Sequence, residues 1–404
     1  MKIIIQNFSY VFLANIANAT SKFIYLVIIT KFLTKDDLGA YTLALALAAP
    51  ISLLFNMKMR SYIISSDFLD YKKFLKFRNI NNIMTIIIAT IISIIFYPEL
   101  LWVMIFVVLS KILEINSEFY QAWPNREKKF KTPAKLMILR TVINTIVFSI
   151  IAIMTKNLIL TLVITALVQF IMLIIEKQIN LRLTDVYNYK EKTLNYRILL
   201  FTLMPLGIVQ ALMSFSTSIP KYLLDYFSNI EIVGIYSAVA YLMSIISLFM
   251  GSINQTLLPY IKKIYNNDLG LFRKFINIYL NVIYIVLSFI FLILTLIWGE
   301  NILTILYTSE FAKYSFILNI CAASIFFNMS GWSYDSALLL SRKIKYQPLF
   351  LIINTIFTVI IGIYLVQNFQ LVGASLTLVI FQFINTLFKA IYFNTSKRIK
   401  ETGG

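Results

Sequence analysis

The chain has 404 residues, of which 59% are hydrophobic and only 13% are charged. Soluble proteins average about 25% charged residues, so this composition excludes an ordinary water-soluble domain. The net charge of +18 would suggest nucleic-acid binding in a soluble protein, but the basic residues lie between apolar stretches, so no nucleic-acid partner is expected. The lack of histidine and the single cysteine, Cys321, exclude histidine-dependent catalysis, an internal disulfide and a cysteine-based metal site.

Apolar stretches long enough to cross a bilayer follow one another along the whole chain. A helix needs about 20 apolar residues to cross roughly 30 Å of hydrocarbon. In chain order the predicted spans are 8–30, 38–55, 80–97, 99–120, 133–154, 158–175, 198–219, 230–257, 275–298, 314–340, 349–366 and 371–392. The sequence therefore predicts an all-α membrane protein with about twelve transmembrane helices. An even number of spans leaves both termini on one side of the membrane.

The connectors between these spans are alternately basic and sparsely charged. The basic connectors are 58–78, 121–132, 176–197, 261–274 and 341–348, and the C-terminal tail is basic as well. Lysine and arginine concentrate in the cytoplasmic loops of membrane proteins. We therefore expect a multi-pass protein with both termini in the cytoplasm.

A short motif recurs at an offset of 195 residues. After the first span it consists of Phe32, Asp36, Leu38, Gly39, Tyr41 and Thr42, and after the seventh of Phe227, Glu231, Val233, Gly234, Tyr236 and Ser237. The offset is close to half the chain. It predicts two parallel six-helix lobes, residues 1–190 and 191–404, as in transporters built from parallel repeats. The expected cargo site is a central cavity between such lobes.

Few ionisable residues fall within the predicted spans. Each costs about 2.5 to 3.5 kcal/mol near the centre of a span, and therefore tends to face a bundle interior or a wet cavity. The cations are Lys22, Lys111 and Arg140, with Arg60 near a span end, and the carboxylates are Glu114, Glu118 and Asp335. Three of them, Lys111, Glu114 and Glu118, share one helix face because they lie at i, i+3 and i+7.

Two interpretations of these charges are open. In the first, the cations line a cavity and bind an anionic cargo. In the second, Lys111 pairs with Glu114, and Arg140 pairs with Glu114 or Glu118 at a similar depth, so that the charges only fix helix packing. Asp335, close to the inner end of the tenth span, is a candidate coupling carboxylate.

Several motifs resemble those of the Wzx-type oligosaccharide flippases, which handle O-antigen and capsule repeat units. These flippases belong to the multidrug/oligosaccharidyl-lipid/polysaccharide exporter superfamily. The motifs are 31–41 (KFLTKDDLGAY), 46–60 (ALAAPISLLFNMKMR), 111–114 (KILE), 205–207 (PLG), 219–222 (IPKY), 234–237 (GIYS) and 258–260 (LPY). The resemblance covers nearly the whole chain. It departs at Lys221, where the family pattern has an arginine, and lysine lacks the bidentate fork of a guanidinium.

The resemblance implies transport rather than enzymatic chemistry. A similar protein would move undecaprenyl-pyrophosphate-linked oligosaccharide repeat units from the cytoplasmic to the periplasmic leaflet of the bacterial inner membrane, by alternating access. It would need no cofactor beyond H⁺ or Na⁺ coupling, and the polysaccharide polymerase machinery would be a further partner. The cationic lining that binds the pyrophosphate would be Lys22, Arg60, Lys111 and Arg140, and the coupling or pairing carboxylates would be Glu114, Glu118 and Asp335.

Two other functions compete with this interpretation. A multidrug exporter of the same superfamily commonly carries an acidic residue in the first span, whereas the only charge within 8–30 is Lys22. A membrane-embedded oligosaccharide polymerase or glycosyltransferase would be expected to carry a large extracytoplasmic loop, and the connectors on that side are all short. A basic lining favours an anionic cargo over a cationic drug.

Overall fold

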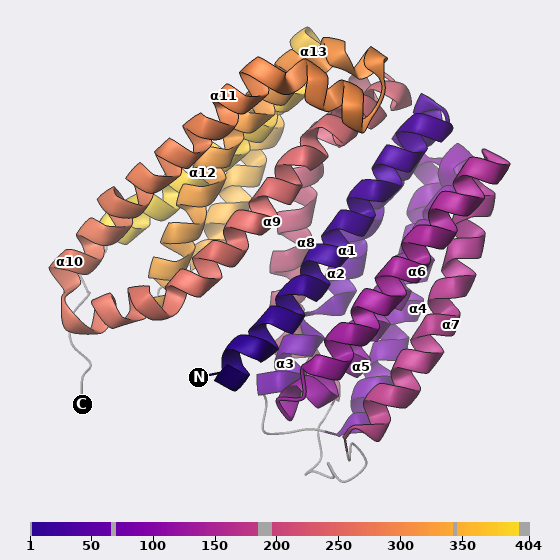
Figure 1. Ribbon diagram of the computed structural model, residues 1–404, viewed down its shortest axis with the longest axis horizontal. Coiled ribbons are helices and arrows are strands. Elements are labelled where there is room, and N and C mark those ends of the chain that lie inside the picture. The colour runs from indigo at the N-terminus through magenta and orange to yellow at the C-terminus, as the bar shows by residue number, and fades with distance from the viewer. Residues whose placement is uncertain (1, 66–69, 185–195, 342–345, 396–404) are drawn as a thin grey trace. The chain divides into compact units, whose positions relative to one another are not determined.

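The computed structural model describes residues 2–65, 70–184, 196–341 and 346–395, and in these ranges the chain is helical with no strand (Figure 1). Eleven of the described helices are long and apolar enough to cross a membrane. The chain divides into two compact units, Met1–Phe215 and Ser216–Gly404, so the division falls within helix α8 (Tyr196–Phe227). The predicted boundary between residues 190 and 191 lies outside the described residues.

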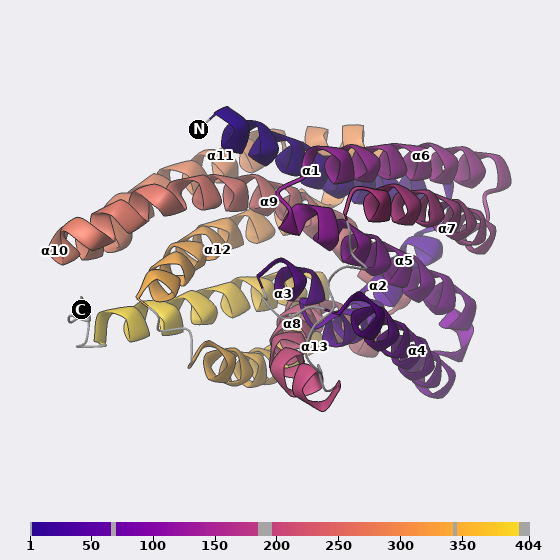
Figure 2. The ribbon, with the colours of Figure 1, turned by 90° about the horizontal axis from the view of Figure 1, so that it is seen from below.

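The first unit is organised around helix α5. Its helices are α1 (Lys2–Phe32), α2 (Lys35–Asn56), α3 (Met59–Ser65), α4 (Tyr71–Phe96), α5 (Leu101–Arg126), α6 (Lys131–Thr155), α7 (Leu158–Arg182) and the first half of α8. Helix α5 packs against α2, α3, α4, α6 and α7, while α1 lies along α6 in both ribbon views (Figure 2). The helix in the middle of this unit is therefore the one that carries Lys111, Glu114 and Glu118.

The second unit is organised around helix α12. Besides the second half of α8, its elements are α9 (Ile230–Asn267), α10 (Leu269–Lys274), a π-helical turn (Phe275–Leu280), α11 (Asn281–Leu306), a 3₁₀ helix (Ser309–Tyr314), α12 (Ser315–Leu340) and α13 (Gln347–Thr395). Helices α9, α11 and α13 all pack against α12. Each unit thus has one central helix.

Helix α13 is a hairpin of two helices joined by a sharp turn. Gln370 has non-helical angles, φ 45° and ψ −116°. On either side of it the chain folds back, because Asn354 donates to the Phe381 carbonyl at 3.1 Å and a Cβ on Gly373 would meet the Leu365 carbonyl oxygen at 2.0 Å. The arms are therefore antiparallel, and they correspond to the predicted spans 349–366 and 371–392. With α13 counted as two, the prediction of about twelve transmembrane helices is confirmed.

The recurring motif is also a structural repeat. Thr34 caps the N-terminus of α2 through a hydrogen bond from the Asp37 backbone N–H, and Asn229, 195 residues later, caps α9 through the Ile232 N–H. Inside the bundle, Ser21 of α1 bonds to Thr145 of α6, and Ser216 of α8 bonds to Thr355 of α13, both at 2.6 Å. The two serines are again 195 residues apart, so the same interhelical contact occurs once in each unit.

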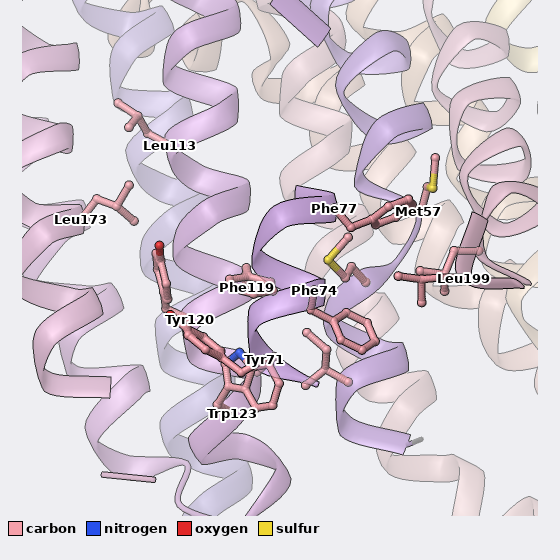
Figure 3. Close-up of a cluster of buried hydrophobic side chains, with 14 residues drawn as sticks. Met57, Tyr71, Phe74, Phe77, Leu113, Phe119, Tyr120, Trp123, Leu173 and Leu199 are labelled. Carbon is pink, nitrogen blue, oxygen red and sulfur yellow. The ribbon is translucent and has the colours of Figure 1, made fainter. Parts of the chain in front are cut away.

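Aromatic side chains bury the ends of α3, α4 and α5 in a cluster that Figure 3 shows from the side. The rings of Tyr71, Phe119 and Trp123 meet there, with centroids 5.3 Å apart for Tyr71 and Trp123. Aromatic pairs of this kind add about 0.5 to 1.5 kcal/mol beyond their buried area. Leu199 of α8 belongs to the same cluster, which fixes the start of α8 to the first unit.

Helix α8 also approaches α2 very closely. A Cβ on Gly207 would lie 2.3 Å from the carbonyl oxygen of Leu54, so only glycine fits at this crossing. Just beyond, α2 ends at Met57 and Lys58, whose φ values of 52° and 48° lie in the left-handed region. This break turns the chain into α3, and Arg60 lies on that short helix rather than at the end of a span.

Candidate functional site

The partly buried charges of the first unit converge on α5. This helix begins after a 3₁₀ turn that contains Pro98, continues through Pro124 near its end, and presents Lys111, Glu114 and Glu118 along one stripe. All three side chains are half-buried. The structure therefore places this predicted set in the middle of a six-helix unit, where charge is costly unless it is paired or wet.

Glu114 is the common acceptor for two lysines. Its Oε1 accepts from Lys22 Nζ of α1 at 2.7 Å and from Asn18 Nδ2 at 3.0 Å, and its Oε2 accepts from Lys111 Nζ at 3.4 Å. The Lys22 side chain is 38% exposed, and those of Lys111 and Glu114 are each 22% exposed. Two cations and one carboxylate leave this group, named the lysine site below, with an excess of positive charge that solvent reaches.

Arg140 has a different partner from the one that the sequence suggested. The expected pair with Glu114 or Glu118 is wrong, because Arg140 NH1 of α6 lies 3.4 Å from Glu176 Oε2 of α7. Ser117 of α5 donates to the same carboxylate oxygen, and Gln121 donates to Ser117. Side-chain exposure is 7% for Arg140 and 0% for Glu176. This pair is enclosed by α5, α6 and α7.

Glu176 was missed because the predicted span ended at residue 175, and the carboxylate was assigned to a basic connector. Helix α7 instead continues to Arg182. A signal was present in the spacing: Ser110 bonds to Gln169 and Ser117 bonds to Glu176, each pair 59 residues apart. A constant difference means that α5 and α7 run parallel, so polar residues at matching seven-residue spacing face each other.

Arg60 and Glu118 lie on the cytoplasmic side that the charge bias predicts. Both are half-buried, and the charge of Arg60 is the strongest among those acting on Glu118. Arg78 of α4 also acts on Glu118. Neither arginine is within 4 Å of a carboxylate in an ion pair that the described residues form, so Glu118 interacts with both at longer range.

Arg78 is a buried cation that sequence reasoning counted only as part of a basic connector. It is 1% exposed, because α4 begins at Tyr71, nine residues before the predicted span. Its guanidinium donates to the side-chain oxygens of Asn56, Asn82 and Asn116, which come from α2, α4 and α5. Neutral amide oxygens thus satisfy the donors of Arg78 and join three helices.

Asp335 lies in the second unit, in a separate ion pair. It accepts from Lys389 of α13 at 2.8 Å and from Gln347 at 3.0 Å, with the carboxylate 33% exposed. Lys389, which the span prediction left near a membrane interface, is 9% exposed and points inward. In the part of the chain that the structure describes, no three His, Cys, Asp or Glu residues gather as a metal site would require.

Comparison with known proteins gives one curated relative and several similar folds. The capsular polysaccharide biosynthesis protein CapF of Staphylococcus aureus is 28% identical over 403 residues, which cover 96% of this chain and 98% of that protein. The lipid II flippase MurJ in an inward closed conformation matches with a TM-score of 0.72 at 15% identity, covering 96% of this chain and 87% of that one.

A multidrug resistance MATE transporter of the MOP superfamily, in an inward-facing conformation, gives a TM-score of 0.63 at 11% identity over 95% of this chain and 93% of that one. These structures establish the fold, which is that of MOP-superfamily transporters. The sequence profile of the polysaccharide biosynthesis proteins matches residues 4–265, more than half of the chain. The chain therefore belongs to the polysaccharide biosynthesis protein family.

Proposed function

We propose that this protein moves a lipid-linked oligosaccharide, carried on undecaprenyl pyrophosphate, from the cytoplasmic to the periplasmic leaflet of a bacterial inner membrane. The observation that carries the proposal is the lysine site, where Lys22 and Lys111 converge with solvent-exposed ammonium groups inside an apolar unit. Membership of the polysaccharide biosynthesis family supports a saccharide cargo.

The chemistry of the cargo matches this arrangement. A pyrophosphate leaving water for a low-dielectric interior needs several charge-assisted hydrogen bonds, and Lys22 and Lys111 supply them from two different helices. The polyprenyl tail stays in the lipid, because each CH₂ withdrawn from an apolar phase costs about 0.8 kcal/mol. No bond is made or broken, so the protein acts as a transporter that exposes the lysine site to one leaflet at a time.

The other predicted cations receive different roles in this proposal. Arg140 stabilises the packing of α5, α6 and α7, because its side chain is 7% exposed and bound to Glu176. Arg60, on the short helix α3 and half-buried, attracts the anionic head group as it approaches from the cytoplasm.

A multidrug exporter is the alternative, since it has the same fold. It is less well supported, because such cargoes are commonly cationic and the lysine site is positively charged. Transport of a cationic dye that depends on Lys22 would favour the exporter over the flippase.

The proposal is tested in liposomes that contain an undecaprenyl-pyrophosphate-linked oligosaccharide with a labelled sugar. Transport is measured as the fraction of label that becomes accessible to a membrane-impermeant reagent. Lys22→Ala combined with Lys111→Ala should reduce the rate at least about tenfold, whereas the double arginine variant should retain more, because charge is the requirement. Lys72→Ala, at an exposed position of α4, is the matched control and should transport normally. Normal transport by the double alanine variant at equal abundance would contradict the proposal.

The orientation, with both termini in the cytoplasm, is tested separately by labelling single cysteines in a Cys321→Ser background. A cysteine that replaces Lys73 should react with an impermeant reagent only after the membrane is opened. Labelling of that cysteine in intact cells would reverse the assigned orientation.

A further inference from the structure

Glu114 occupies the place in the lysine site that an anion would occupy. Three side-chain donors from two helices converge on its carboxylate: Asn18 and Lys22 from α1, and Lys111 from α5. A carboxylate and a phosphate oxygen use the same donors at similar distances. The protein thus holds an anionic group of its own at the point where the proposed function requires the phosphate of the cargo.

The two ion pairs of the first unit differ in whether another anion could replace the carboxylate. The Arg140–Glu176 pair is 7% and 0% exposed, so a solute cannot reach it without opening the packing of three helices. The Lys22–Glu114 pair is 38% and 22% exposed. A half-wet pair has lost only part of its hydration, and its separation therefore costs far less than that of a buried pair.

We infer that Glu114 is an internal competitor of the cargo, which the pyrophosphate displaces from Lys22 and Lys111 when it binds. This inference rests on the proposed function and adds the residue that sets how tightly the anion is held. A pyrophosphate carries more negative charge than one carboxylate and accepts more hydrogen bonds, so it outcompetes Glu114 for the two ammonium groups.

The displaced carboxylate has a physical reason to return. Glu118 lies one turn further along the same face of α5, and its charge interacts with that of Glu114. With the lysines engaged by the cargo, these two carboxylates are no longer screened from each other by Lys22, and like charges at i and i+4 repel. The return of Glu114 to the lysines then assists release of the anion at the opposite leaflet.

The experiment measures binding of inorganic pyrophosphate to the purified full chain in detergent by calorimetry. Removing the competitor in Glu114→Gln should tighten pyrophosphate binding by roughly tenfold, or about 1.4 kcal/mol. The same variant should transport more slowly in liposomes, because the bound anion is no longer expelled. Binding to Lys22→Gln/Lys111→Gln should be lost.

Asp335→Asn is the matched control, because it releases Lys389 of the second unit from a carboxylate at 2.8 Å with a comparable exposure of 33%. It should bind pyrophosphate as the unmodified protein does. Equal or weaker binding by Glu114→Gln, at an unchanged melting temperature, would overturn the competitor role. If Glu114→Gln does not fold, Glu114→Asp, which withdraws the carboxylate by one CH₂, should tighten binding to a smaller degree, and unchanged or weaker binding by it would overturn the role too.

The outcome also separates this inference from the proposed function. Tighter pyrophosphate binding by Glu114→Gln, without any movement of lipid-linked oligosaccharide by the unmodified protein, would retain the competitor and reject the cargo. Transport of the oligosaccharide with no change of affinity in Glu114→Gln would retain the cargo and reject the competitor.

Discussion

The central helices of the two units, α5 and α12, have the same build and different chemistry. Each is 26 residues long, follows a short 3₁₀ helix and packs against most of the helices of its unit. At the same steps along the helix, Lys111, Glu114 and Glu118 of α5 correspond to Ile325, Asn328 and Trp332 of α12. The fold therefore does not need the charges of α5, which leaves a function as the reason for their presence.

The enclosed pair of the first unit gives the largest expected effect. Glu176→Leu leaves the guanidinium of Arg140 buried without its carboxylate and should lower the free energy of unfolding by about 3 to 5 kcal/mol. Arg140→Met combined with Glu176→Leu should be much milder, because no charge is stranded. Thermal unfolding in detergent measures both. A double variant as unstable as the single one would mean that the pair is not a closed structural unit.

Introducing a charge into α12 breaks the asymmetry from the other side. Asn328→Glu should cost about 2.5 to 3.5 kcal/mol, because α12 contains no lysine or arginine to pair with it. Asn328→Gln is the control and should have little effect. The abundance of each variant in the membrane and its melting temperature report the difference. Tolerance of Asn328→Glu would show that α12 has the same wet surroundings as α5.

The hydroxyl contacts that the two units share should respond equally, and weakly. Thr145 and Thr355 each donate to the carbonyl four residues earlier at 2.7 Å, so Ser21 and Ser216 are the donors of the bonds between helices. Interhelical hydrogen bonds in membranes average about 0.6 kcal/mol. Thr145→Val and Thr355→Val should therefore each lower stability by this order, measured as a shift in melting temperature. Markedly unequal shifts would argue against a true repeat.

The sequence predicts local features of this fold well. Apolar runs locate the helices, since the bilayer demands about 20 such residues per crossing, and the motif at offset 195 identifies equivalent caps at Thr34 and Asn229. Helix ends were less well placed, because hydropathy marks only the apolar part of a helix. For this reason Arg78 and Glu176, which lie beyond that part, were assigned to connectors although α4 and α7 include them.

Pairing between helices was harder to predict than the helices themselves. The proximity of Lys111 and Glu114 follows from spacing within one helix. The choice of Glu176 rather than Glu114 as the partner of Arg140 depends on α7 packing parallel to α5, which depth along neighbouring spans does not reveal. The same holds for Lys22, whose bond to Glu114 depends on the approach of α1 to α5.

The paired hydroxyl contacts have a consequence for the ancestry of the chain. Two copies of one six-helix segment, joined end to end, reproduce the Ser21 contact at Ser216 and the Thr34 cap at Asn229. Because six is even, the second copy enters the membrane in the same direction as the first, and a gene duplication needs no rewriting of its insertion signals. Mutation could then alter one central helix freely while its twin preserved the scaffold.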